Sequence, residues 1–335
     1  MRIAVDAMGG DYAPGEIVAG CVAAARELAG IDELILVGDE SAIEAELNKA
    51  SARPANIRIV HASEVIGMDE SPAVAIRRKK HSSILMATDL VKSGQADAVF
   101  SAGNTGAMVV AATLRLRTLA GVDRPAIAAV FPTPTNEFVL VDAGANTDCT
   151  PAMLAQFGAM GEVYARKILG VEKPRVGLLS IGEEDAKGNE ATREAFKLLE
   201  ASPMNFVGNV ESRDLFEGRV DVVACDGFVG NVVLKTSEAV AKATFSWLKT
   251  ELTRTTWRTF MAGMLRGAFM DAKKKADPET YGGAPLLGAN GFVYIGHGSS
   301  SARAVRNALG VMARAIEIDV NHLIIDQVQA LEPAV

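Results

Sequence analysis

The sequence predicts an α/β protein whose mainly parallel sheet is covered by helices on both faces. Three observations lead to this prediction. Short runs rich in β-branched residues alternate with amphipathic segments, the strand-like runs are almost continuously apolar, and aromatic residues make up only 5% of the chain. Strands that are apolar throughout are typical of sheets buried on both faces. Alternation of strand and helix favours parallel pairing through helical crossovers.

The elements follow one another without a break that would separate domains. Each expected strand is a short apolar run, and these runs lie at residues 2–6, 34–37, 57–60, 97–101, 126–131, 138–142, 175–180, 205–208, 220–225 and 292–296. The expected helices lie at residues 15–29, 41–50, 71–93, 105–119, 150–169, 189–201, 230–276 and 299–319. Residues 277–291 indicate an ordered glycine-rich loop. No Pro/Gly/Ser-rich linker interrupts the 335 residues, so we expect a single α/β domain over residues 1–335.

Composition excludes several classes of protein. The hydrophobic share of 49% and the charged share of 22% are typical of a folded globular protein rather than a disordered one. A net charge of −7 argues against nucleic acid as a partner, because binding to a polyanion relies on a basic surface.

The cysteines and the N-terminus predict a cytoplasmic location. Cys21, Cys149 and Cys225 are few, odd in number and far apart, which gives neither a disulfide framework nor a zinc site. The chain begins Met-Arg-Ile-Ala-Val-Asp, unlike a signal peptide. No apolar run approaches the roughly 20 residues that span a bilayer.

Polar, glycine-rich loops follow six of the expected strands. They occupy residues 6–11, 101–106, 142–146, 180–185, 226–231 and 296–300. Ligands of parallel α/β sheets bind beyond the carboxyl ends of the strands. Any one such loop is explained equally well as an ordinary turn with helix-capping residues. Six of them together indicate one shared site.

The loop at residues 101–106, Ser-Ala-Gly-Asn-Thr-Gly, has the composition of a phosphate-binding turn. Gly103 would let the backbone approach an anion, Asn104 and Thr105 carry side-chain donors, and the following helix would point free N–H groups at the ligand. The Walker A pattern is absent, and no GxGxxG follows the first strand, so neither nucleotide motif is present.

Two polar side chains are candidates for catalysis. Lys187 follows a strand and could hold a phosphate or stabilise an oxyanion, although a lysine in a surface turn is the plainer alternative. Asn231 lies where a long helix begins, and is either a structural cap or an oxyanion donor.

The sequence does not decide the role of three other polar residues. Arg77 and Lys80 would share one side of a helix, and they form either a solvated face or part of an anion site. His297 either approaches the site or serves in the core or a turn. The histidines have no metal-binding spacing, and no GxSxG or Cys–His arrangement is visible, so we expect neither a metal nor a covalent nucleophile.

Residues 254–275 differ from the rest of the chain. Apolar side chains at helical spacing form one stripe that consists of Trp257, Phe260, Met261, Met264, Leu265 and Ala268. Arg254 and Arg258 flank this stripe. The pattern is typical of a helix at a membrane surface or on a partner protein, and equally of a helix that faces its own core or a second subunit.

Taken together, the motifs resemble those of the PlsX family of acyl-carrier-protein:phosphate acyltransferases. The resemblance begins at Asp6-Ala-Met-Gly-Gly-Asp-Tyr-Ala-Pro and includes Ser71-Pro72, the basic cluster at 77–80 with Ser82-Ser83, the loops named above, Ser180–Asn189, Tyr281–Gly288 and His297–Ser300. It covers nearly the whole chain in the expected order.

The resemblance implies a fold similar to phosphotransacetylases and isopropylmalate-type dehydrogenases, and a homodimer. It implies transfer of a fatty acyl group from acyl-carrier protein to inorganic phosphate, without a cofactor. The acyl phosphate would supply a membrane glycerol-3-phosphate acyltransferase in phospholipid synthesis. The segment at about 240–285 corresponds to the protruding region that contacts membranes in the family, so the protein would be peripherally associated with an anionic membrane surface.

Residue roles follow from the same resemblance. Lys187 and Asn231 match the family's catalytic positions. The expected phosphate- and substrate-binding residues are Asp6, Gly9, Gly10, Arg77, Lys80, Ser101, Gly103, Asn104, Thr105, Asp142, Asn146, Asp226 and His297. The expected membrane or carrier contacts are Trp257, Phe260, Met261, Met264, Leu265, Arg254 and Arg258.

The chemistry of the expected substrates agrees with these roles. Phosphate is an anionic nucleophile at neutral pH and a thioester is an activated acyl donor, so direct attack needs positioning and oxyanion stabilisation more than a covalent intermediate. Two alternatives remain. One is a dehydrogenase, suggested by fold analogy alone, and the other is a non-enzymatic scaffold of lipid synthesis attached to membranes through residues 254–275.

Overall fold

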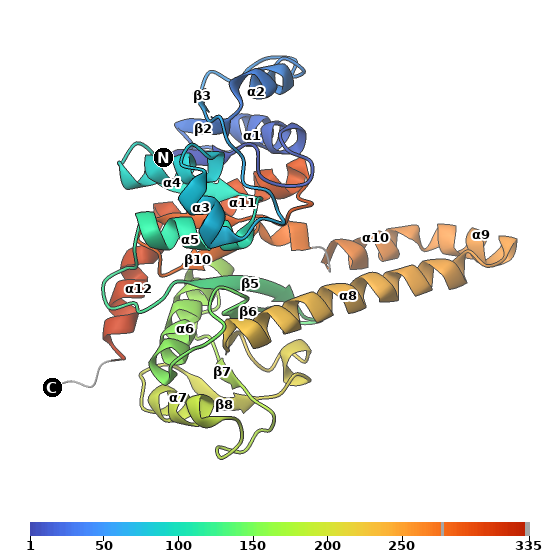
Figure 1. The fold of residues 1–335 in the computed structure, drawn as a ribbon. Helices are drawn as coiled ribbons and strands as arrows, with labels where there is room; N and C mark the ends of the chain where they lie inside the picture. Colours follow the sequence, from blue (N-terminus) through green and yellow to red (C-terminus); the bar gives the residue numbers. More distant parts are fainter. Residues whose placement is uncertain (276–277, 332–335) are drawn as a thin grey trace.

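The apolar runs form the strands of one eleven-stranded sheet in this computed structural model, which describes residues 1–275 and 278–331 (Figure 1). All ten expected strands are present, and the order across the sheet is β3-β2-β1-β4-β11-β10-β5-β6-β9-β7-β8. The strands are β1 (Arg2–Asp6), β2 (Glu33–Gly38), β3 (Ile57–His61), β4 (Ala98–Ser101), β5 (Ala126–Pro132), β6 (Glu137–Val141), β7 (Val176–Leu179), β8 (Phe206–Val210), β9 (Val222–Ala224), β10 (Ala284–Leu287) and β11 (Phe292–Ile295).

Most strand pairs are parallel, as expected, and the exceptions lie at the centre of the sheet. β10 pairs antiparallel with both β11 and β5, and β5 pairs antiparallel with β6. β10 lies inside residues 277–291, which the sequence indicated to be a loop; residue 277 lies outside the described residues. The strand is only four residues long, contains Pro285 and is bounded by Gly283 and Gly288, so its sequence has the features of a turn.

Helices cover both faces of the sheet and bury two separate apolar clusters, one on each face. One cluster contains residues of α1, α6, α11 and α12, and the other contains residues of α3, α4 and α5. The α-helices are α1 (Gly15–Glu27), α2 (Glu40–Leu47), α3 (Pro72–Arg78), α4 (Ser83–Lys92), α5 (Thr105–Arg115), α6 (Pro151–Tyr164), α7 (Glu190–Glu200), α8 (Gly227–Leu252), α9 (Thr256–Met264), α10 (Arg266–Lys275), α11 (Ala302–Glu317) and α12 (Val320–Gln329). A π-helix follows α6 at Ala165–Leu169, and 3-10 turns lie at Asp214–Phe216 and Pro278–Tyr281.

The single helix expected at residues 71–93 is wrong, because the chain breaks between α3 and α4. Ser82 bridges to Glu64, and the N–H of Ser83 donates to the Glu64 carbonyl. The Ser82 hydroxyl also donates to the carbonyl of Lys79. These bonds hold the intervening residues in an extended path that a continuous helix could not follow.

Two further differences concern the second half of the chain. The helix expected at 230–276 is instead α8, α9 and α10, with a turn at Thr253–Thr255 and a second break at Leu265; residue 276 lies outside the described residues. The sequence analysis also omitted α12. Asp319 adopts a left-handed conformation, with φ of 48°, and its side chain caps the new helix.

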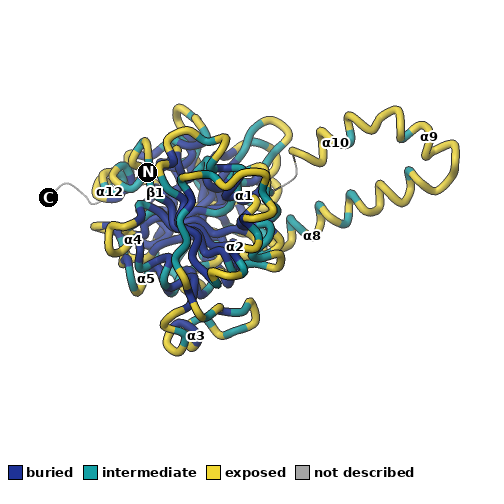
Figure 2. Tube along the Cα trace, turned by 90° about the horizontal axis from the view of Figure 1, so that it is seen from above, coloured by how far each residue is buried: buried dark blue, intermediate teal, exposed yellow. Residues whose placement is uncertain are grey.

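The helices α8, α9 and α10 form a hairpin that projects from the body of the protein (Figure 1). The first turns of α8 pack on the body, and we call the residues beyond them, 235–275, the arm. Only Gly227 and Gly230 of α8 are buried, and neither α9 nor α10 has a buried residue. Figure 2 shows this contrast with the body, whose strands are buried. In the part of the chain that the structure describes, no helix is both long and apolar enough to cross a membrane.

Candidate active site

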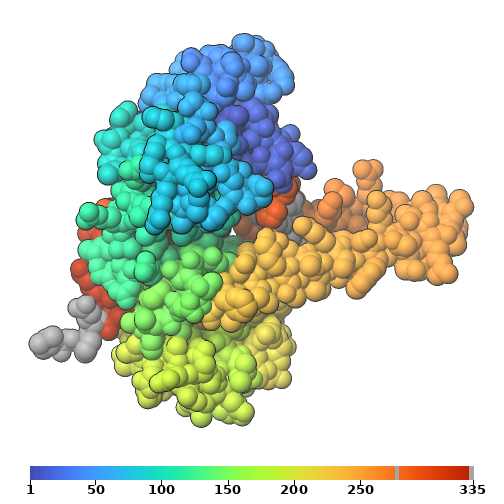
Figure 3. Space-filling model, viewed as in Figure 1, coloured from blue at the N-terminus to red at the C-terminus, as the bar shows by residue number. Residues whose placement is uncertain are grey.

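The strand order gathers the six polar loops into two groups, and because three antiparallel pairings separate β11 from β6, the strands of the two groups run in opposite directions. β1, β4 and β11 are parallel neighbours, and we call the loops that follow them the first group. β6, β9 and β7 are also parallel neighbours, and their loops form the second group. Figure 3 shows the surface hollowed between the cyan residues around α3 and the gold start of α8. Each group therefore brings together predicted site residues from neighbouring loops.

Asp6 and Ser101 organise the first group. The Ser101 hydroxyl donates to Asp6 Oδ2 over 2.7 Å and accepts from the N–H of Gly103 over 3.0 Å. Asp6 also accepts from the N–H of Met8. Burial raises the pKa of Asp6, while these donors oppose that shift. Both side chains are buried, so they hold the loops in place rather than face the solvent.

Glycines let the loops of the first group pack backbone against backbone. A Cβ on Gly9 would lie 2.6 Å from Asp6 Oδ2 and 2.7 Å from the amide nitrogen of Gly103. Gly10 has φ of 109° and lies beneath the carbonyl of Gly298, so it also requires glycine. The glycines therefore allow these turns to pack closely against one another.

Asn104 differs from its predicted role as a donor to a ligand. Its Oδ1 accepts from the N–H of Ala107 and caps α5, while its Nδ2 donates to the carbonyls of Gly67, Met68 and Glu70. The side-chain amide is therefore engaged within the protein. Thr105, at the first position of α5, is exposed and remains available to a ligand.

Asp142 organises the second group. Its buried carboxylate accepts hydrogen bonds of 2.7–3.0 Å from five N–H donors: the backbone of Ile127, Gly144, Ala145 and Asn146, and the Asn146 side chain. Burial raises the pKa of Asp142, and the N–H groups act in the opposite direction by stabilising the charged form. Asp142 and Asn146 thus fold their own loop, and neither side chain is directed at a ligand.

Two glycines attach the start of α8 to this loop. A Cβ on Gly230 would lie 1.8 Å from the carbonyl oxygen of Asp142, and one on Gly227 would lie 2.7 Å from Asp142 Oδ2. Asp226 caps the helix by accepting from the N–H of Val229. Asn231 is therefore not the cap. Its side chain is exposed in the second turn of α8 and lies beside Gly144.

Lys187 lies in the loop between β7 and α7. Its backbone N–H donates to the carbonyl of Glu184, which also accepts from the Asn209 side chain. Gly188, with φ of 98°, turns the chain toward Asn189, the cap of α7. The Lys187 side chain is exposed and makes no ion pair with any residue that the structure describes. Since β7 and β9 are neighbours, Lys187 and Asn231 lie on adjacent loops at one edge.

Some expected side chains are not brought together in the predicted way. Arg77 is in the last turn of α3 and Lys80 lies beyond its end, so the two do not share a helix face. Both are exposed. His297 is also exposed, follows β11 and contacts the hydroxyl of Ser299 through Nδ1 over 2.8 Å.

Two cysteines lie beside Asp142, a proximity that the sequence did not indicate. Cys225 contacts the carbonyl of Asp142, and Cys149 contacts that of Asn146. Burial raises the pKa of the Cys149 thiol to about 11 and places that of Cys225 well above its usual value. Both thiols are protonated at neutral pH, and a thiol is a poor nucleophile. Cys149 and Cys225 therefore pack against the backbone of the Asp142 loop.

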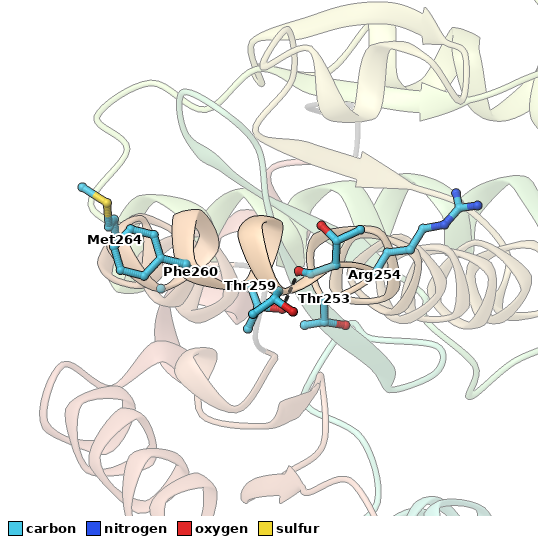
Figure 4. A pocket seen from close by; sticks show the side chains of 8 residues that line it. Thr253, Arg254, Thr259, Phe260 and Met264 are labelled. Atoms are coloured by element: carbon cyan, nitrogen blue, oxygen red, sulfur yellow. Dashed lines mark hydrogen bonds between the residues drawn. The ribbon is translucent and has the colours of Figure 1, made fainter.

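The tip of the arm presents the apolar side chains that the sequence singled out. Trp257 stacks on Phe260 with ring centroids 5.9 Å apart, and 69% of Trp257 is exposed. Figure 4 shows Phe260 and Met264 next to one another on α9, with Arg254 extending from the preceding turn. Met261 and Leu265 are exposed as well. A core-facing role for this stripe is thereby contradicted.

Comparison with known proteins agrees with the fold and identifies the family. A family model described as fatty acid synthesis protein matches residues 1–323. Curated relatives named phosphate acyltransferase include one from Pelotomaculum thermopropionicum, 53% identical over 95% of this chain and 92% of the relative, and one from Geobacter sulfurreducens, 50% identical over 98% and 94%. A phosphotransacetylase from Streptococcus pyogenes shares the fold, with a TM-score of 0.64 at 17% identity over 95% of this chain and 94% of the other. The chain therefore belongs to the fatty acid synthesis protein family, the PlsX family that its motifs indicated, and is an acyltransferase.

Proposed function

We propose that this acyltransferase moves a fatty acyl group from the thioester of an acyl-carrier protein to inorganic phosphate, giving acyl phosphate and free carrier protein. The single observation that supports this most is the pairing of Lys187 and Asn231 on adjacent loops, both exposed at the carboxyl edge of the sheet. The name shared by the curated relatives, phosphate acyltransferase, supports phosphate as the acceptor.

Phosphate binds, in this proposal, to the turn that begins α5. The helix begins at Thr105, whose side chain is exposed, and the positive end of the helix dipole favours an anion there. Gly9, Gly10 and Gly103 contribute backbone rather than side chains. Asp6, Ser101, Asn104, Asp142, Asn146 and Asp226 act as positioning residues, because their polar groups are engaged inside the protein. Arg77, Lys80 and His297 are exposed groups that would attract the anion.

The reaction needs no enzyme nucleophile. A phosphate oxygen attacks the thioester carbon, the carbonyl oxygen becomes an oxyanion, and collapse of the tetrahedral species breaks the C–S bond and expels the carrier's thiolate, which takes a proton from water. The Lys187 ammonium and the Asn231 amide donate to the oxyanion. The raised pKa values of Cys149 and Cys225 support direct attack, since neither thiol is an activated nucleophile.

Partners would use the arm. The exposed stripe of Trp257, Phe260, Met261, Met264 and Leu265 suits the interface of an anionic membrane, with Arg254 and Arg258 near the headgroups. The basic residues of the arm would also suit an acidic carrier protein. The long, unburied α8 supports a homodimer in which a second subunit packs on the arm. An arm bound to the membrane would also bring acyl phosphate to a membrane glycerol-3-phosphate acyltransferase. The body of the protein would then lie in the cytoplasm.

A single-turnover assay tests the reaction. Purified protein is mixed with palmitoyl-carrier protein and labelled phosphate, and acyl phosphate is trapped with hydroxylamine. We expect phosphate-dependent product in the wild type, and a loss of about 100-fold or more in Lys187→Ala and Asn231→Ala, which is the usual effect of removing an oxyanion donor.

The control is Lys197→Ala, which removes an exposed lysine from the neighbouring α7. It should leave the rate unchanged. Wild-type protein that forms no acyl phosphate would eliminate the proposed reaction, whereas full activity in Lys187→Ala and Asn231→Ala would eliminate only the assigned roles.

A further inference from the structure

Large apolar side chains are exposed in several parts of the molecule, and two of these parts bear on substrate binding. One part is the arm. The other consists of the segments that follow the carboxyl ends of strands, where the exposed side chains are Tyr12, Val65, Met68, Val74, Ile181, Phe228, Val229 and Val232. An anion site needs cations and N–H groups, so apolar side chains beside it indicate that the ligand also has an apolar part.

The second group of loops holds the most exposed of these side chains. Ile181 follows β7 and is 83% exposed, while Phe228 and Val232 in the first turns of α8 are 64% and 51% exposed. Phe228 and Val232 are four residues apart and therefore lie on one face of the helix. Gly227 and Gly230 occupy the face that packs on Asp142, which turns Phe228 and Val232 outward.

These apolar side chains flank the predicted oxyanion donors. Asn231 is three residues from Phe228 on the same helix, and Lys187 belongs to the same loop as Ile181. In the sheet, Leu178 of β7 lies opposite Ala224 of β9, so the chain leaves both strands at one level. An acyl carbonyl held by Lys187 and Asn231 would place its first methylene groups among these side chains.

We propose that Ile181, Phe228 and Val232 form the proximal part of the acyl-chain site, in which the methylene groups next to the thioester lie during transfer. This inference rests on the proposed function, because it assumes a fatty acyl donor and a carbonyl at Lys187 and Asn231. Contact with the chain would remove apolar surface of both partners from water, and this gain grows with chain length up to the extent of the site.

We favour Ile181, Phe228 and Val232 as the acyl-chain site over two other arrangements. Tyr12 and Met68 are also exposed beside the first group, but they belong to or contact the turns that would hold phosphate. A second subunit could cover Phe228 instead of a ligand. Both arrangements predict different results in the experiment below.

The test compares chain lengths in single variants. We expect Phe228→Ser and Ile181→Ser to lower kcat/KM for palmitoyl-carrier protein by about 10-fold, the usual effect of one altered apolar contact. The value for acetyl-carrier protein should stay within about 2-fold, because the acetyl group has no methylene groups to contact the site. Val232→Ser provides a third, independent variant. Leu114→Ser, which alters an equally exposed apolar residue on α5, should change neither value. Thermal melts check that each variant is folded.

Three results would overturn the inference. Equal losses for both chain lengths would show that Phe228 and Ile181 do not contact the chain. A variant that loses its dimer in light scattering, with no change in length preference, would assign the patch to a second subunit. A length-dependent loss in Met68→Ser but not in Phe228→Ser would place the acyl chain beside the first group of loops. If the wild type forms no acyl phosphate from either donor, the proposed function fails first and this inference with it.

Discussion

The body and the arm differ in how far their side chains are buried. In the body, the buried carboxylate of Asp142 is surrounded by N–H donors from its own loop, and the apolar side chains fill two clusters. In the arm, neither α9 nor α10 buries a residue, and the ring of Trp257 contacts that of Phe260 while most of it faces solvent. The body buries its apolar side chains against one another, whereas the arm presents apolar side chains to solvent.

Local interactions keep the arm helical in the absence of burial. Thr255 caps α9 by accepting from the N–H of Arg258, and Glu251 pairs with Arg254 and Arg258 across the turn. Such interactions contribute little each, because isolated short helices are marginal in water. The same substitution should therefore have a different result in the two regions, and the following predictions use that difference.

The largest contrast is expected between two glycines. Gly230→Ala places a methyl group 1.8 Å from the carbonyl oxygen of Asp142 if nothing moves, so α8 must shift; we expect unfolding to become easier by about 3 kcal/mol and turnover to fall, because Asn231 moves with the helix. In Gly263→Ala the methyl group meets open space in α9, and higher helix propensity should stabilise the arm by up to about 1 kcal/mol.

Urea denaturation measured by circular dichroism distinguishes the two outcomes. Gly230→Ala with wild-type stability would show that the contact between α8 and the Asp142 loop is not tight. A strong loss in Gly263→Ala would show that α9 packs on something in solution.

A second, smaller effect is expected when a buried acceptor becomes a donor. Asp142→Asn replaces one carboxylate oxygen with an NH₂ group that faces N–H groups, so at least one donor loses its partner. We expect a loss of about 2 kcal/mol, within the range for an unsatisfied buried polar group. The exposed cap substitution Asn189→Asp keeps its acceptor oxygen and should cost less than about 0.5 kcal/mol. Equal stability of both variants in urea would contradict this account of Asp142.

The sequence predicted the repetitive parts of the body better than the irregular ones. Apolar runs located all ten expected strands, because burial on both faces leaves a clear pattern. β10 was missed since its glycines and Pro285 give it the composition of a turn. Val320, Ile324 and Val328 are buried at helical spacing and could have predicted α12. The sequence analysis omitted it because the last expected helix ended at residue 319.

For the site, the loops were predictable and the role of each side chain was not. Six polar loops at strand ends indicated one shared site, but the antiparallel β10 and β5 divide them into two groups whose strands run in opposite directions. Whether a polar side chain faces a ligand or its own backbone depends on loop geometry, which composition does not determine. Asn104 and Asp142 are examples: their residue types suit ligand binding, yet their polar atoms are engaged within the protein. The sequence analysis did not predict the role of Gly227 and Gly230, which attach α8 to the Asp142 loop.

The arm should tolerate substitutions that the body would not. Phe260→Ser removes an exposed ring from α9, so we expect a change of less than about 0.5 kcal/mol in the free energy of unfolding. If α9 is the membrane contact, sedimentation with phosphatidylglycerol vesicles should fall by about 10-fold, because the ring's apolar surface no longer enters the interface.

The matched control for the arm is Phe216→Ser, which alters a partly exposed ring in the body that contacts Phe131 and Phe138. It should reduce stability and leave vesicle binding unchanged. Unaltered vesicle binding by Phe260→Ser would remove α9 from the proposed membrane contact.

The smallest effect is expected from Glu251, whose carboxylate pairs with the two arginines that would otherwise bind anionic headgroups. Glu251 Oε2 lies 2.9 Å from Arg258 and 3.6 Å from Arg254, so one carboxylate partly neutralises both arginines at the tip. All three side chains are exposed, and Glu251→Gln should therefore barely change stability. It should increase binding to phosphatidylglycerol vesicles by a few-fold, because each basic residue near an anionic surface contributes about 1 kcal/mol. Glu194→Gln removes the same charge from α7 of the body. If both variants gain equally, net charge rather than the position of the arginines controls binding; a gain confined to Glu251→Gln, and lost in high salt, would assign the effect to the tip of the arm.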